Sequence, residues 1–121
     1  MRLLRELNRN VINAGAQGLK IITAGDMSQA SVTSSVFDVE HTPIVSVECS
    51  WTGTAPVGTL QLQGSISGVN YFNVGSSVAV SGNTGCVQLA DANAGYLFAR
   101  VVFTKTSGTG TLTAFADAKG F

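Results

Sequence analysis

Charged side chains are scarce in this sequence. Asp, Glu, Lys and Arg make up only 12% of its 121 residues, about half of the usual share of roughly 25%. Together with a mean hydropathy of +0.29, this excludes a disordered charged tail. It also excludes a coiled coil, which would be rich in Glu, Lys and Leu. Seven basic and seven acidic side chains cancel, so the chain as a whole is not a basic nucleic-acid-binding protein.

Long apolar runs and cysteines are lacking as well. No segment approaches the about 18–20 consecutive apolar residues that a transmembrane helix needs. The first residues include too many polar side chains for the apolar centre of a signal peptide, so we expect the protein to be made in a cytoplasm. Cys49 and Cys86 are too few for a disulfide scaffold, and we expect two free thiols, with Cys49 on the apolar face of its strand.

Small and β-favouring residues are abundant instead. Gly occurs 14 times, Ser and Thr occur 12 times each, and apolar residues make up 45% of the chain. Period-two alternation and turn-rich separators about every ten residues predict one all-β domain, an antiparallel, jelly-roll-like β-sandwich of about seven or eight strands. The predicted strands are residues 31–39, 43–52, 58–66, 71–75, 77–81, 86–90, 96–105 and 110–117. The Gly-containing segments between them, including 53–56 and 107–110, are predicted as turns.

Alternation along these strands predicts which side chains are buried. In a strand with one solvated face, apolar residues at every second position face the core. The predicted inner residues are Val45, Val47, Cys49, Trp51, Leu60, Leu62, Ile66, Val87, Leu89, Leu97, Ala99, Val101 and Phe103. The strand at 96–105 is largely apolar on its other face too, through Tyr96, Phe98 and Val102 beside Arg100. Such a strand is either central and covered by other parts of the chain or contacts another subunit.

Residues 1–14 have the pattern of an amphipathic helix. Leu3, Leu7 and Val11 recur at every fourth position and form an apolar stripe. A helix of about 13 residues is marginal alone in water, so the stripe must pack on its own sheet, on another protein or on another copy of the chain. Contact of the arginines with a membrane surface or a nucleic acid is a further alternative. The predicted partner-binding residues are Leu3, Leu4, Leu7, Val11, Ile12, Arg2, Arg5 and Arg9.

The distribution of charge divides the chain into two parts. Residues 1–20 carry four cations and one acid, a net charge of +3, and residues 21–121 carry three cations and six acids, a net charge of −3. This asymmetry predicts different partners for the two parts. We therefore expect an N-terminal helical arm at 1–18, a connector at 19–30 and the β-sandwich domain at 31–121. Within the connector, a short strand at 20–23 is an option.

Residues that could support catalysis or metal binding are few. His41 is the only histidine and lies in a predicted loop, with no nucleophile motif in the chain. The acids are scattered, and no phosphate-binding loop motif occurs. We therefore expect no enzymatic activity, no cofactor and no metal site. Trp51, Tyr71 and Tyr96 could instead bind sugar rings, although packing in the core is the commoner role of such aromatic residues.

An ordered series of segments resembles a known class of protein. The series is WTGT at 51–54, PVGTLQLQGS at 56–65, GVNY at 68–71, GYLFARVVFT at 95–104 and SGTGTL at 107–112. Over residues 43–117 it resembles the small β-sandwich domains of bacteriophage virion structural proteins, which occur in capsid decoration, head-fibre and tail components. Residues 63–70 also resemble discoidin-like domains, but Ser67 stands where an Asp usually precedes the glycine. That departure weakens any inference of calcium or sugar binding from the discoidin-like family.

The virion resemblance implies a function without catalysis. We expect a virion structural protein, such as a capsid decoration, head-fibre, spike or tail component, that assembles in multiple copies through the N-terminal arm. Its expected partners are other virion proteins and copies of itself, and nucleic-acid contact by the basic arm is a secondary option. Its expected location is the virion, after synthesis in the cytoplasm of a bacterial host. The alternative function is that of a carbohydrate-binding module for host-surface glycans.

Overall fold

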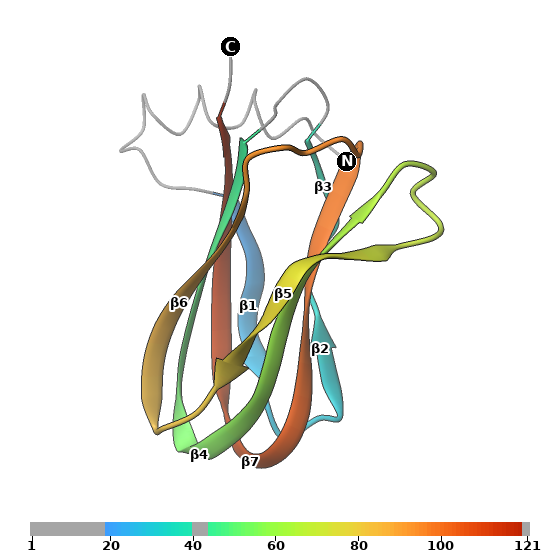
Figure 1. Cartoon of the computed structure of the whole chain (residues 1–121). Helices are drawn as coiled ribbons and strands as arrows, with labels where there is room; N and C mark the ends of the chain where they lie inside the picture. The colour runs from blue at the N-terminus through green and yellow to red at the C-terminus, as the bar shows by residue number, and fades with distance from the viewer. Residues whose placement is uncertain (1–18, 40–43, 120–121) are drawn as a thin grey trace.

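The computed structural model describes residues 19–39 and 44–119, which form one antiparallel sheet of seven strands (Figure 1). The strands are β1 (Leu19–Asp26), β2 (Ser31–Thr33), β3 (Phe37–Asp38), β4 (Ile44–Ser65), β5 (Phe72–Val80), β6 (Thr84–Asp91) and β7 (Phe98–Lys119). The predicted all-β, antiparallel architecture is confirmed, and the helix predicted at 1–14 lies outside the described residues. Within the described ranges, no helix has the length and apolar character needed to cross a membrane.

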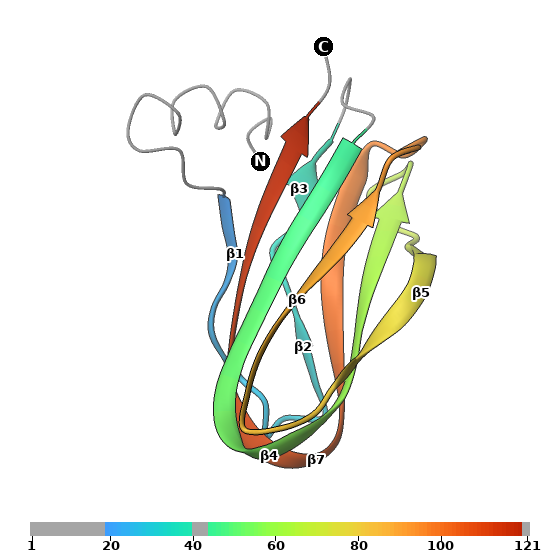
Figure 2. The ribbon, with the colours of Figure 1, turned by 60° about the vertical axis from the view of Figure 1, so that its left-hand side comes forward.

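β4 and β7 organise the whole sheet. Each has 22 residues, and they pair from Ile44 opposite Lys119 to Ser65 opposite Phe98. Both strands bend at the lower end of the molecule in Figures 1 and 2, so the sheet folds over on itself into two layers. The first layer contains the first half of β4 and the second half of β7, flanked by β6 and β1. The second layer contains their other halves, flanked by β5 on one side and by β2 and β3 on the other.

The bend requires backbone conformations that a flat sheet does not have. The register between β4 and β7 shifts there, and Ala55 and Gly108 have positive φ values of 49° and 82°. A Cβ atom on Gly108 would lie 2.0 Å from the carbonyl oxygen of Ala55, so only glycine fits at this corner. The prediction that 53–56 and 107–110 are turns that separate strands is wrong. β4 and β7 pair with each other before the bend and again after it, so each remains one strand.

The interior between the layers is filled by alternate residues of β4 and β7. The alternation predicted for the first half of β4 is confirmed: the inward side chains are buried, whereas those of Ser46, Glu48 and Ser50 are not. The buried residues of the two long strands are Val45, Val47, Cys49, Trp51, Leu60, Leu62, Ala99, Val101, Phe103, Leu112, Ala114 and Ala116. Burial of each larger apolar side chain contributes about 1.5–3 kcal/mol, so this interior is the main source of stability.

Two residues predicted to face the core lie outside it. Ile66 follows the last residue of β4, Leu97 precedes the first residue of β7, and both are exposed. The backbone N–H of Leu97 donates to the carbonyl oxygen of Ser65 over 3.0 Å, which holds the two strand ends together. Alternation predicts the side of a residue only while the strand continues, and both strands end before the sequence pattern does.

Residues 19–30, predicted as a connector, supply the first strand of the sheet. β1 pairs with the second half of β7. Ile21 and Ile22 are both buried, because a register shift beside them turns two successive side chains inward. Met27, which follows β1, is fully enclosed. In place of one strand at 31–39 the structure has the short strands β2 and β3, which both pair with β7.

Candidate functional site

All of the predicted partner-binding residues lie outside the described residues. They are Leu3, Leu4, Leu7, Val11, Ile12, Arg2, Arg5 and Arg9. His41, for which no catalytic role is predicted, lies outside them as well. Among residues 19–39 and 44–119, no group of three or more His, Cys, Asp or Glu side chains could hold a metal ion.

Two of the three aromatic candidates for sugar binding are buried. Trp51 and Tyr96 are each only 5% exposed. The Trp51 ring lies so close to Gly85 that a Cβ atom there would be 2.2 Å from it, and its Nε1 donates to the carbonyl oxygen of Gly82 over 3.2 Å. The prediction that Trp51 or Tyr96 forms a sugar-binding platform is therefore wrong, because each ring is buried and packs against a glycine.

Tyr96 plays the same structural part in the second layer. Its ring covers Gly64, where a Cβ atom would lie 2.7 Å from it, and its hydroxyl donates to Asp91 Oδ2 over 2.9 Å. Phe72 packs against it edge-on, with ring centroids 6.1 Å apart. Burial raises the pKa of the Tyr96 hydroxyl, and the hydrogen bond to Asp91 and the Asp91 charge raise it further. Tyr96 is thus neutral at physiological pH and acts as a packing residue.

The two thiols lie on opposite faces of the first layer. Cys49 of β4 is buried, as predicted, and Cys86 of β6 is exposed; both are free. Burial raises the pKa of the Cys49 thiol to about 12. At neutral pH Cys49 therefore stays protonated and lacks the thiolate that nucleophilic or metal chemistry needs.

The outer face of the second layer carries a hydrogen-bonded row of polar side chains. Arg100 of β7, Gln63 of β4 and Asn73 of β5 are direct neighbours in the strand register, and we call them the Arg100 row. Arg100 Nε donates to Gln63 Oε1 over 2.8 Å, and Gln63 Nε2 donates to Asn73 Oδ1 over 3.0 Å. This direction of bonding leaves the Nη groups of Arg100 and the Nδ2 group of Asn73 without a partner among the described residues.

Tyr71 holds the Arg100 side chain from another direction. The guanidinium carbon lies 3.9 Å from the centre of the Tyr71 ring, a cation–π contact. The N–H bonds of a guanidinium lie in its plane, so stacking occupies its face and leaves its edge available. Phe98 and Val102 lie two positions before and after Arg100 on the same face of β7, and both are half-buried. The face therefore combines one positioned positive charge with partly exposed apolar side chains.

An apolar surface surrounds the loop between β4 and β5. Ile66 and Val69 lie in this loop and are 61% and 78% exposed, and Phe72 and Leu97 beside it are exposed as well. We call these four residues the apolar loop surface. The loop projects away from the sandwich (Figure 1). Single exposed apolar residues are ordinary, but several around one projecting loop are typical of a contact with another molecule.

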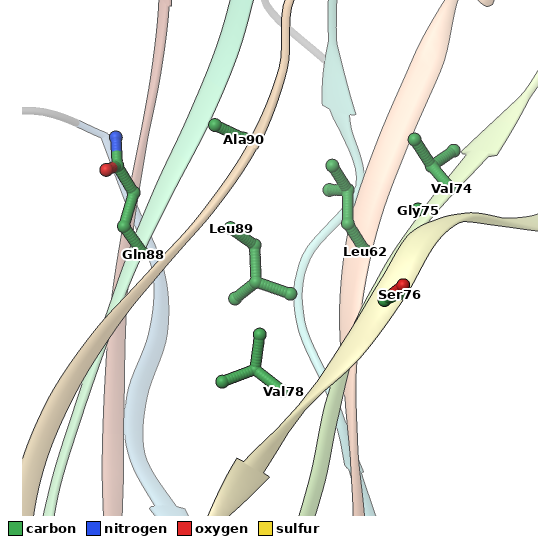
Figure 3. Close-up of a pocket in the computed structure, with 8 residues that line it drawn as sticks. All are labelled: Leu62, Val74, Gly75, Ser76, Val78, Gln88, Leu89 and Ala90. Atoms are coloured by element: carbon green, nitrogen blue, oxygen red, sulfur yellow. The ribbon is translucent and has the colours of Figure 1, made fainter.

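A hollow lies at the side of the sandwich between β5 and β6, where Leu62, Val78 and Leu89 point toward the gap (Figure 3). Its volume is about 190 Å³. It is lined by Leu62, Val74, Gly75, Ser76, Val78, Gln88, Leu89 and Ala90. None of these side chains titrates, so the hollow offers no acid–base or metal chemistry.

Comparison with known proteins identifies neighbours of the fold. No protein-family model matches the sequence, and no curated protein matches it. The structure of PirA is similar over 78% of this chain and 91% of its own, with 22% identity and a TM-score of 0.54. The SPBc2 prophage-derived protein YomS is similar over 84% of this chain and 96% of its own, with 13% identity and a TM-score of 0.50.

A third neighbour is the carbohydrate-binding module CBM28, described as specific for non-crystalline cellulose. It is similar over 88% of this chain and 76% of its own, with 8% identity and a TM-score of 0.53. At such low identities these likenesses show the fold alone. The class of protein that they define is the β-sandwich.

The Arg100 row is a site that sequence reasoning did not find. Alternation predicts Gln63 and Arg100 on the outer faces of their strands, and the structure confirms that orientation. It does not predict that they meet, because the register between two strands depends on pairing between distant parts of the chain. The signal in the sequence that could have pointed to this row is the presence of planar polar side chains at outward positions of the predicted strands 58–66 and 96–105. The structure shows that the strand at 96–105 is central in the sheet, flanked by β4 on one side and by β2 and β3 on the other, but Phe98 and Val102 on its outer face are only half-buried. Contact of this face with another subunit therefore stays a prediction.

Proposed function

We propose that the protein is a non-enzymatic structural component of a bacteriophage virion that assembles in multiple copies. The observation that carries this proposal is the apolar loop surface, whose side chains face water in an isolated chain. Covering apolar surface by a neighbouring protein is favourable by about 25 cal/mol per Å². The small share of charged residues supports the proposal, because copies that lie close together repel one another little.

Two further observations support the same function. The fold is shared with a prophage-derived protein, and residues 43–117 resemble the β-sandwich domains of virion proteins. In this function the arm at 1–18 docks on the virion shell or on a neighbouring copy through its apolar stripe, and the apolar loop surface contacts the next protein. The β-sandwich is then the body that carries the apolar loop surface.

Incorporation into particles tests this proposal. The unaltered chain and its variants are expressed in cells that produce the phage, and copies per purified particle are counted by mass spectrometry. Deletion of residues 1–18, and the double substitution Ile66→Ser with Val69→Ser, are each expected to abolish incorporation and to leave the sandwich folded. Ile44→Ser is the matched control, because it makes the same chemical change at an exposed position at the start of β4. Normal incorporation of both variants, or absence of the chain from particles, contradicts the proposal.

A second candidate function is that of a carbohydrate-binding module for host-surface glycans, and the Arg100 row favours it. Sugars present hydroxyl groups at their edges and C–H groups on their faces, so their sites combine amide or guanidinium groups with aromatic side chains. Gln63 and Asn73 supply amides, and Tyr71 supplies an aromatic ring beside Arg100. CBM28 shares the fold. The two functions are compatible, because a virion protein can also bind the surface of a host.

A further inference from the structure

We propose that the Arg100 row binds an acidic saccharide, and that Arg100 holds the carboxylate or sulfate group of the sugar. This inference rests on the carbohydrate-binding candidate function and adds the charge of the ligand. It starts from one observation: Arg100 is held by Gln63 and Tyr71, yet no carboxylate among the described residues pairs with it. A positioned cation that contacts no counter-charge in the described part of the chain can hold an anion.

The geometry of Arg100 fits an acid group of a ligand. A guanidinium has five N–H donors, and the bond to Gln63 uses only the one on Nε. Tyr71 covers a face of the guanidinium and leaves the Nη edge available. That edge is a planar fork whose spacing matches the two oxygens of a carboxylate. Because Gln63 and Tyr71 already restrain the side chain, binding costs little additional side-chain entropy.

The charges around the face indicate where the acid group lies. Asp38 is on the same outer face, but β3 pairs with β7 at Phe98, on the side of β7 away from β4. That carboxylate lies across β7 from the amide groups of Gln63 and Asn73. On the other side, Asn73 adds N–H donors at the end of the row. The acid group therefore lies on the β4 and β5 side of Arg100, where Asn73 can donate to a neighbouring sugar oxygen.

A saccharide fits this face better than a nucleic acid does. Nucleic-acid binding relies on several cations that neutralise successive phosphates. The other cations whose side chains the structure describes are elsewhere: Lys20 lies over Phe115 on the first layer, and Lys105 donates to the carbonyl oxygen of Ser28. One cation beside half-buried apolar side chains instead matches a ring that carries a single acid group and C–H faces.

Paired oligosaccharides test the inference on the full chain. The panel contains oligosaccharides that bear uronic acid, sialic acid or sulfate, each measured beside its neutral parent by titration calorimetry at low salt. We expect an acidic member to bind about tenfold or more tightly than its parent, as for hydrogen bonds to a charged group. Arg100→Ala should remove this preference, and Arg100→Lys should restore only part of it, because an ammonium group lacks the planar fork.

Lys20→Ala is the matched control for the loss of a cation. Lys20 Nζ lies 5.4 Å from the centre of the Phe115 ring, so the variant also removes a cation–π contact, but from the opposite outer face. Its preference for the acidic saccharide should equal that of the unaltered chain. Equal binding of acidic and neutral partners would overturn acid recognition and leave carbohydrate binding standing. Binding of neither would overturn both, and tighter binding of an oligodeoxythymidylate of equal charge would replace the saccharide by a nucleic acid.

Discussion

The two layers of the sandwich are built from the same two strands, yet their outer faces differ. Each face carries a cation over an aromatic ring, Lys20 over Phe115 on the first layer and Arg100 over Tyr71 on the second. Arg100 is also hydrogen-bonded to Gln63, and through Gln63 to Asn73, so three strands are linked. The strand framework is thus common to both faces, and the difference between the faces lies in their outward side chains.

The inner faces of the two layers, unlike the outer faces, resemble each other, because each has one aromatic ring packed against a glycine. Trp51 closes the first layer above Gly85, and Tyr96 closes the second above Gly64. Each ring also places its polar atom on an acceptor, the carbonyl oxygen of Gly82 or the carboxylate of Asp91. Both rings are therefore explained by packing, although aromatic residues of this kind stand out in the sequence as candidates for binding.

Breaking the bend is expected to have the largest effect, because both layers depend on it. Gly108→Ala brings a Cβ atom to 2.0 Å from the Ala55 carbonyl oxygen at a φ of 82°. We expect the free energy of unfolding, measured in urea, to fall by about 2–5 kcal/mol. Gly75→Ala is the matched control: its φ of 69° is also positive, but no atom lies within 4 Å of the added carbon, so we expect a loss of about 1 kcal/mol. Equal losses would show that close approach is not what the bend requires.

At high pH the free energy of unfolding is expected to fall because of Tyr96, whose ring covers Gly64 in the second layer. Burial raises the pKa of Tyr96 above its ordinary value of 10.0, so the unfolded chain loses this proton at a lower pH than the folded chain. The contribution of Tyr96 to the free energy of unfolding is complete below pH 10 and is lost as the pH rises toward the pKa of Tyr96 in the folded chain. Cys49 in the first layer acts in the same direction, because its pKa is raised from 9.0 to about 12.

Tyr96→Phe separates the two contributions. At neutral pH this substitution should lower the free energy of unfolding by about 1 kcal/mol, because the hydrogen bond to Asp91 is lost. Above pH 10 it should flatten the fall of stability, and the fall that remains belongs to Cys49 and to other groups. Urea midpoints measured from pH 7 to pH 11 check this expectation. A slope as steep in Tyr96→Phe as in the unaltered chain would rule out Tyr96 as its source.

The smallest effect is expected from the cations of the two outer faces. Arg100→Ala and Lys20→Ala should each change the free energy of unfolding by at most about 1 kcal/mol, because contacts at partly exposed sites are weak. Arg100→Ala should cost the more of the two, since Arg100 also donates to Gln63. Thermal unfolding measures both. A loss of well over 2 kcal/mol for Arg100→Ala would make the row a stabilising element rather than a binding surface.

The sequence predicted much of the fold through local patterns. The parity of β4 placed Cys49 inside, and that of β6 placed Cys86 outside, because a strand turns successive side chains to opposite faces whatever it pairs with. Ile66 and Leu97 escaped the same rule, because their strands end just before the pattern does. For the Arg100 row, the alternation predicted that Gln63 and Arg100 face outward, but it did not predict the hydrogen bond between them.

By itself, the sequence determined that this is an antiparallel β protein, and it determined which side of most strands faces the core, because both follow from composition and from a period of two residues. Only the tertiary structure decided that 53–56 and 107–110 are bends within two long strands rather than ends of four short ones. It also decided that Arg100 and Gln63, 37 positions apart in the chain, are joined by a hydrogen bond. The physical reason is the same in both cases: strand register and sheet curvature arise from pairing between distant segments, which no local pattern records.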